Sequence, residues 1–127
     1  MYEDYSKEQL ALLANHEEFL VRWSVAKRPN TSPETLDHLA NDGVWMVRRD
    51  VAENPNTSPE TLERLANDEA YEVRRGVALN PRTSPETLER LANDWDWIVR
   101  RGVVGNLNTP QYIKTYLKIK KFLNCYE

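Results

Sequence analysis

Arginines that could bind another molecule recur in pairs every 26 residues along this chain. The paired positions hold Arg22 and Trp23, Arg48 and Arg49, Arg74 and Arg75, and Arg100 and Arg101. On a helical wheel Arg74 falls on the inward face, between Val77 and Ala78, whereas Arg75 points to the side. A guanidinium bridges several acceptors at fixed angles. We therefore predict that the first arginine of each pair is partly buried and binds helix-end carbonyls or the aspartates of the LAND segments, which are Asp42, Asp68 and Asp94.

The second arginines are compatible with a different chemistry, the binding of a phosphate backbone. A nucleic-acid surface of this kind would use Arg49, Arg75 and Arg101 with the C-terminal lysines Lys114, Lys118 and Lys121. Interleaved acidic residues and a net charge of −3 count against it. Nucleic-acid binding is therefore the alternative, and binding to another protein is the preferred interpretation.

A row of aromatic residues follows the same period: Phe19, Trp45, Tyr71 and Trp97. Each aromatic residue precedes the first arginine of a pair by three positions, which allows a cation–π contact. The row is consistent with packing at the edge of the core, and also with a line of exposed anchors for a partner. We favour the first interpretation.

The positions that differ between the two best-matched units predict a partner-binding surface, because one face of a stack is free to vary while the core repeats. The residues of this predicted surface are Trp45, Met46, Asp50, Glu53, Tyr71, Glu72, Leu79, Trp95, Trp97 and Ile98. An equally weighted alternative is that the varying positions adapt the packing of one unit on the next. In that case Gly76 and Gly102 allow helices to approach closely.

The element that positions these residues is a 26-residue unit with two helical patterns, and residues 47–72 and 73–98 match at 19 of 26 positions. One pattern starts at Thr83 or Ser84, with Thr83 and Glu86 spaced as a capping box, and has an apolar stripe of leucines and alanine. The other pattern starts after a capping aspartate such as Asp94 and stops at an Asn-Pro pair such as that at Asn80.

Neither short helix is stable alone in water, so consecutive units must bury their apolar stripes against one another. We predict an all-α solenoid of about four and a half repeats that forms one domain over residues 1–127. The divisions are a half repeat at 6–20, full repeats at 21–46, 47–72 and 73–98, and a divergent last repeat at 99–127. The last repeat ends in a capping helix whose lysines face water.

The motif VRRxVAxNPxTxxExLxxLAxD, recurring in register from residue 6 to about residue 117, resembles the leucine-rich repeat variant family of bacterial proteins. The resemblance implies a right-handed superhelix related to HEAT-type repeats, in which one helix of each pair is partly 3₁₀. The founding type of the family carries an iron–sulfur cluster in a separate cysteine-rich segment. This chain has Cys125 as its only cysteine, so the resemblance transfers no cluster and no catalytic residues.

No residue pattern predicts catalysis, a cofactor or a metal site. His16 and His38 lie 22 positions apart without metal-ligand neighbours and are expected at the surface. No apolar run reaches the roughly 18–20 residues of a membrane span, and the start of the chain lacks the apolar core of a secretory signal. We expect a cytoplasmic, non-catalytic scaffold. The acidic start and basic end also suit weak head-to-tail self-association of an otherwise monomeric protein.

Overall fold

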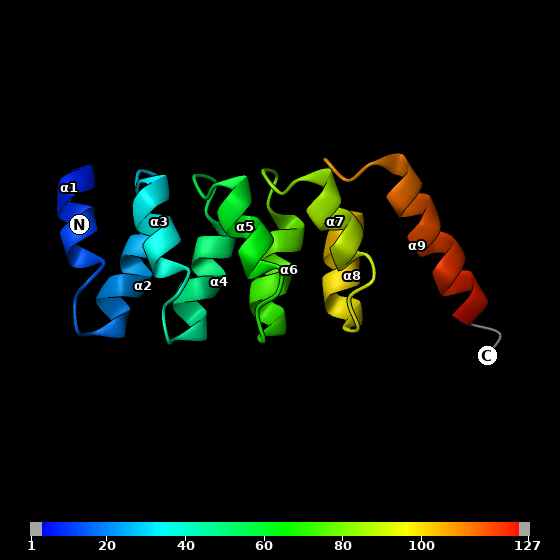
Figure 1. The fold of residues 1–127 in the computed structure, drawn as a ribbon, viewed down its shortest axis with the longest axis horizontal. Coiled ribbons are helices and arrows are strands. Elements are labelled where there is room, and N and C mark those ends of the chain that lie inside the picture. Colours follow the sequence, from blue (N-terminus) through cyan, green and yellow to red (C-terminus); the bar gives the residue numbers. More distant parts are fainter. Residues whose placement is uncertain (1–3, 125–127) are drawn as a thin grey trace.

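The computed structural model of the chain describes residues 4–124, and all regular secondary structure in that range is helical. The helices are α1 (Lys7–Leu13), α2 (Phe19–Lys27), α3 (Pro33–Leu39), α4 (Trp45–Glu53), α5 (Pro59–Leu65), α6 (Tyr71–Leu79), α7 (Pro85–Leu91), α8 (Trp97–Gly105) and α9 (Gln111–Asn124). Figure 1 shows them following one another in chain order along the long axis. The predicted all-α solenoid is confirmed. Over the described range both helices of each pair are α-helices, without the 3₁₀ turns that the resemblance implied.

The helices form two layers. The even-numbered helices α2, α4, α6 and α8 are nine residues long and pack side by side, each against the next one in the row. The shorter α1, α3, α5 and α7 are seven residues long and pack on the even-numbered helices. The core between the layers repeats with the sequence, because one leucine from each short helix is fully buried at the same position: Leu10, Leu36, Leu62 and Leu88.

Each of the helices α3, α5 and α7 begins with a serine cap and a proline in its first turn. In α7 the Ser84 hydroxyl accepts a hydrogen bond from the Thr87 amide at 3.2 Å. The predicted capping box of Thr83 and Glu86 is therefore wrong. Thr83 is buried, and its hydroxyl donates to the Val77 carbonyl at 2.6 Å, which satisfies the C-terminal end of α6.

The aspartates expected to cap the longer helices act one turn earlier. In the unit that contains α6, the Asp68 carboxylate accepts from the Ala70 amide at 2.9 Å, and the helix begins at Tyr71 with Ala70 in the capping position. The aspartate therefore closes the bend that leads into the helix. The other carboxylate oxygen of Asp68, Oδ2, stays available to bind Arg48.

Buried asparagines join the C-terminal ends of the longer helices. The Asn80 side-chain amide donates to the carbonyls of Ala52 at 2.7 Å and Asn54 at 3.0 Å, both in the preceding unit. Its side-chain oxygen accepts from the Arg82 amide at 2.9 Å. Asn54 and Asn106 repeat this arrangement one unit earlier and one unit later. The Asn-Pro pair was predicted only to stop a helix, but its asparagine also binds one unit to the next.

Two glycines set the close approach of α4, α6 and α8. A Cβ atom added at Gly76 would lie 2.9 Å from the Ala52 Cβ, and one added at Gly102 would lie 3.0 Å from the Ala78 Cβ. Carbon atoms in contact prefer about 3.5–4.0 Å, so neither site has room for a side chain. The alternative interpretation of the varying positions, adaptation of unit-to-unit packing, is therefore confirmed for these two residues.

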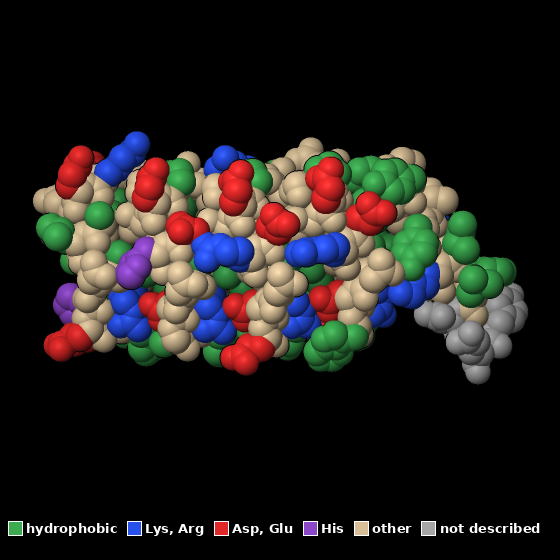
Figure 2. Space-filling view, viewed as in Figure 1, with side chains coloured by type: hydrophobic (Ala, Val, Ile, Leu, Met, Phe, Trp, Pro, Cys, Tyr) green, Lys and Arg blue, Asp and Glu red, His purple; other side chains and the backbone are tan. Residues whose placement is uncertain are grey.

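Helix α9 ends the row and differs from the predicted capping helix. Ile113 and Leu117 are buried, but Tyr112, Ile119 and Leu123 are at least half exposed. Figure 2 shows hydrophobic side chains gathered at this end of the molecule. The outer side of α9 is therefore mixed in character rather than uniformly basic.

Substitution of Gly76 by alanine should destabilise the protein, because the new methyl group meets the Ala52 side chain. We expect a loss of about 1–3 kcal/mol from overpacking, which exceeds the gain of about 0.5–1 kcal/mol in helix propensity. Urea unfolding followed by circular dichroism measures the change. Gly105→Ala is the matched control, since its nearest atom would be Leu79 Cδ2 at 3.8 Å. Equal shifts for the two variants would contradict the packing argument.

Candidate partner-binding groove

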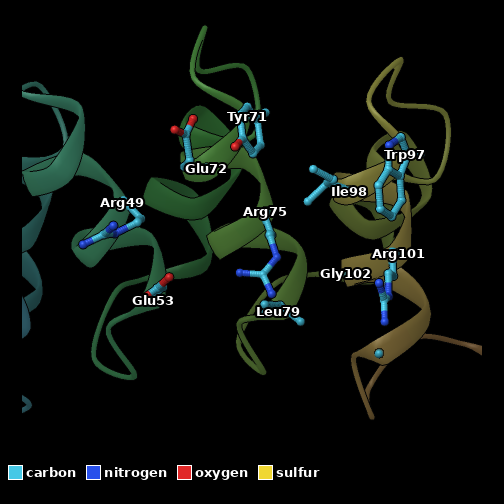
Figure 3. Close-up of a pocket in the computed structure, with 11 residues that line it drawn as sticks. Arg49, Glu53, Tyr71, Glu72, Arg75, Leu79, Trp97, Ile98, Arg101 and Gly102 are labelled. Carbon is cyan, nitrogen blue, oxygen red and sulfur yellow. The ribbon is translucent and has the colours of Figure 1, made fainter.

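A groove of about 850 Å³ crosses the exposed faces of α4, α6 and α8. Its lining residues are Arg49 and Glu53 from α4, Tyr71, Glu72, Arg75 and Leu79 from α6, and Trp97, Ile98, Arg101, Gly102 and Gly105 from α8 (Figure 3). The short distance between these helices, set by Gly76 and Gly102, places residues from three units on one surface. The groove is thus a product of stacking, and no single unit contains it.

Helical spacing aligns an aromatic ring and an arginine within each unit. Tyr71 and Arg75 are four residues apart on α6, and Trp97 and Arg101 are four apart on α8, so each pair shares a helix face. The rings are 39% and 58% exposed, which means that more than a third of each is available for contact. Ile98 points from α8 toward α6, between the two units (Figure 3).

The helices that carry the groove are held by the first arginine of each pair. Arg48 donates from Nε to Asp68 Oδ2 at 2.7 Å and from Nη2 to Asp68 Oδ1 at 3.2 Å, in the loop that leads into α6. Its Nη1 donates to the Asp42 carbonyl, in the loop that leads into α4, at 2.7 Å. One guanidinium therefore ties two successive loops together, and the prediction for these arginines is confirmed.

The same bridge forms in the neighbouring units, from Arg22 to Asp42 and from Arg74 to Asp94. Figure 2 shows a row in which basic and acidic side chains alternate along the lower part of the visible face. The row ends at Arg100, which donates to the Asp94 carbonyl at 2.7 Å. The last repeat lacks one residue before Pro110, so one unit beyond Asp94 the sequence has Ile119 in place of an aspartate.

The bridge changes the acidity of Asp42. Burial alone would raise the pKa of its carboxyl group, but the hydrogen bonds from Arg22 and from the Val44 amide, with the nearby charges of Arg22 and Arg48, outweigh burial and lower the pKa. The folded protein therefore favours the ionised form of Asp42.

One departure from the repeat closes the groove at α2. Trp23 stands where the later units have the second arginine, and its indole nitrogen donates to Asp50 Oδ2. The Lys27 ammonium lies 4.3 Å from the centre of the Trp23 ring. Asp50 also binds Arg49, with 3.3 Å between Oδ1 and Nε. These contacts fill the place that the groove would occupy one unit earlier.

The charges in the groove are unequally satisfied. Arg49 has Asp50 as its ion-pair partner, whereas within residues 4–124 neither Arg75 nor Arg101 forms an ion pair or donates a side-chain hydrogen bond. Loss of water around Glu53, together with the charge of Asp50, raises the pKa of the Glu53 carboxyl, although Arg49 and Arg75 act in the opposite direction. The groove thus has two uncommitted guanidinium groups.

Six of the ten residues predicted to bind a partner line the groove: Glu53, Tyr71, Glu72, Leu79, Trp97 and Ile98. The other four, Trp45, Met46, Asp50 and Trp95, lie outside it. Asp50 is only 6% exposed and serves the packing of α2 on α4.

The cation–π contact that the spacing allows between each aromatic residue of the row and the first arginine does not form for Trp45 or Trp97. Trp45 instead contacts the second arginine, Arg49, whose guanidinium carbon is 5.4 Å from the ring centre. Arg74, the first arginine of its pair, lies 5.3 Å from the ring centre of Trp95, which is outside the aromatic row. The aromatic row is consequently more exposed than edge-of-core packing predicted.

The residues predicted for nucleic-acid binding separate into two groups. Arg49, Arg75 and Arg101 line the groove, whereas Lys114, Lys118 and Lys121 are on α9. The arginines and the aromatic residues, predicted for competing functions, lie together in one groove. The four-residue spacing of Tyr71 and Arg75 was the signal that could have united them.

The histidines have local roles. His16 stands at the place of a bend-closing aspartate, and its Nδ1 accepts from the Glu18 amide at 3.0 Å. His38 Nε2 lies 2.9 Å from Asn15 Oδ1. Across residues 4–124 there is no cluster of three histidine, cysteine, aspartate or glutamate side chains arranged to hold a metal ion. Cys125 lies outside the described residues.

In the part of the chain that the structure describes, every helix is too short or too polar to cross a bilayer.

Fold and groove together define this chain as a helical-repeat protein. The profile of the leucine rich repeat variant family matches residues 45–70 and 71–96. The resemblance seen in the repeat motif is thereby confirmed. No curated protein matches the chain.

A solved structure agrees with this assignment. It is described as a leucine-rich repeat variant with a novel repetitive protein structural motif, and it superposes with a TM-score of 0.66 at 30% sequence identity. The alignment covers 87% of this chain and 49% of the other, so this chain spans about half the length of that protein.

Replacement of Arg48 by lysine should weaken the protein more than replacement of Arg100 by lysine. Lysine keeps the charge but cannot reach the Asp68 carboxylate and the Asp42 carbonyl in the same planar geometry. We expect Arg48→Lys to lower the free energy of unfolding by about 1–3 kcal/mol. Arg100→Lys disturbs a single carbonyl contact and should cost less. Urea titration of both variants tests this, and equal losses would show that the bridge from Arg48 to Asp68 contributes nothing.

The contribution of Asp42 to stability should disappear in acid. Because its folded-state pKa is lowered, the stabilisation is complete above the unfolded pKa of about 3.9 and is lost as the pH falls through the folded-state value. The difference in free energy of unfolding between the wild type and Asp42→Asn should be constant from neutral pH to about pH 5, and should shrink below about pH 4. Unfolding curves recorded across this range measure it, and a difference independent of pH would refute the assignment.

Proposed function

We propose that this chain is a non-catalytic protein-interaction module whose partner binds in the groove across α4, α6 and α8. The observation that carries the proposal is the exposure of Trp97 and Tyr71 beside Arg101 and Arg75 on rigidly packed helices. Aromatic and arginine side chains contribute most to binding energy at protein interfaces. Exposed as they are here, they contribute little to the stability of the fold itself.

The groove is also held in shape before any partner arrives. Its three helices are fixed by the bridges from Arg48 and Arg74 and by the tight contacts at Gly76 and Gly102. A preformed surface loses little conformational entropy on binding. This favours a binding role over one that requires a moving active site. We also propose a reducing, cytoplasmic setting, because the sequence contains a single cysteine.

Nucleic-acid binding is the second candidate, because Arg49, Arg75 and Arg101 occupy the same position in three consecutive units. The groove, however, also contains Glu53 and Glu72, and Arg49 is paired with Asp50. A phosphate backbone would meet carboxylates along the same path. Protein binding is therefore better supported.

The proposal predicts that partners are lost when groove residues change and are kept when a matched residue elsewhere changes. Trp97→Ala and Arg101→Ala should each abolish capture of the specific partners from an extract of the source cell. Trp95→Ala alters a more exposed tryptophan outside the groove, 79% against 58%, and should retain the same partners.

Quantitative mass spectrometry of the captured proteins, with melting curves for each variant, provides the measurement. An unchanged set of partners in all three variants would refute the groove as the binding site. A steep decrease in the amount of captured partner between low and moderate salt, together with co-purified nucleic acid, would favour nucleic-acid binding.

A further inference from the structure

We propose that the groove binds an extended, acidic peptide segment, with two of its carboxylates held by Arg75 and Arg101 and an apolar side chain between them. This inference rests on the proposed function and names the class of partner that the groove recognises.

The two arginines supply the first argument. Of the three that line the groove, Arg49 is neutralised by Asp50, while Arg75 and Arg101 form no ion pair within residues 4–124. Both occupy the same position in successive units and project from adjacent helices into the groove (Figure 3). A guanidinium binds a carboxylate through two parallel hydrogen bonds, so each arginine is a ready site for one acidic side chain.

The distance between the helices selects the spacing of those acidic residues. Packed helices lie about 8–10 Å apart, and Gly102 allows α6 and α8 to approach closely. A peptide in the polyproline II conformation advances about 3.1 Å per residue and returns to the same face every three residues. Carboxylates three positions apart would therefore be about 9 Å from each other, which matches one step of the solenoid.

Apolar atoms lie between the two arginines. Leu79 is 39% exposed at the end of α6, and Ile98 points from α8 toward α6 (Figure 3). Gly102 and Gly105 have no side chains to fill the intervening space. A hydrophobic residue between the two acidic ones would contact this surface and exclude water from the ion pairs, which strengthens them.

The two ends of the groove also differ in charge. Glu53 lies on α4 and Glu72 in the first turn of α6, and Trp23 closes the groove at α2, whereas the α8 end contains Arg101 and Trp97. An acidic segment is repelled at the first end and attracted at the second. The two acidic residues should therefore lie over α6 and α8, and the part of the peptide over α4 should be neutral or basic.

A random peptide display library selected on the immobilised chain tests the inference. We expect the enriched peptides to carry aspartate or glutamate three positions apart with an apolar residue between them. For a synthetic peptide of the enriched sequence, Arg75→Ala and Arg101→Ala should each weaken binding about tenfold or more. Arg82→Ala removes an exposed arginine outside the groove and should leave the affinity unchanged. Glu72→Gln should strengthen binding by about two- to fivefold.

The outcomes separate this inference from the proposed function. Enriched peptides without acidic residues, whose binding is lost in Trp97→Ala, would overturn the acidic class and leave the groove as the binding site. Peptides that bind Trp97→Ala, Arg75→Ala and Arg101→Ala as tightly as the wild type would overturn both proposals. A single-stranded oligonucleotide that competes for the groove with a steep salt dependence would overturn the peptide in favour of nucleic acid. Failure to enrich any peptide would overturn the inference as well.

Discussion

The bridge from one arginine to the aspartate that precedes the next long helix is the interaction on which this solenoid depends. Apolar burial supplies most of the free energy, but it is non-directional and would tolerate a unit that slides or rotates on its neighbour. The Arg48 guanidinium prevents such sliding and rotation, because it must bind the Asp68 carboxylate and the Asp42 carbonyl at the same time. Its cost of burial is offset because each charge has a hydrogen-bonded partner. The bridge therefore sets the register of the stack.

Buried hydrogen bonds at the helix ends complete this specification. Short helices have many unpaired terminal groups relative to their length, and here they lie inside the stack. The Thr83 hydroxyl and the Asn80 amide satisfy carbonyls at the ends of the longer helices, within the unit and in the preceding unit respectively. Among the described side chains no buried polar atom lacks a partner. Each unit thus presents to the next the same acceptors that it used itself, which is why the structure can be extended by repetition.

The groove arises where the repeat is broken. Trp23 replaces an arginine and, with Asp50, closes the surface at α2, while Gly76 and Gly102 bring the later helices close together. The shared residues build the scaffold, and the unshared ones determine where a cavity opens and which charges face it. Arg75 and Arg101 are left uncommitted because the units that carry them have glycine where Asp50 neutralises Arg49.

The amino-acid sequence alone determined the helical repeat, its period, the buried leucine and valine positions and the inward direction of the first arginines, because these follow from local periodicity. It also identified six lining residues of the groove among the ten predicted. Only the tertiary structure decided that Asn80 reaches the preceding unit, that Trp95 lies outside the groove and that aromatic and arginine residues share one surface. These features depend on the distance and angle between units, which are set by contacts between residues far apart in the chain, such as that of Gly76 with Ala52.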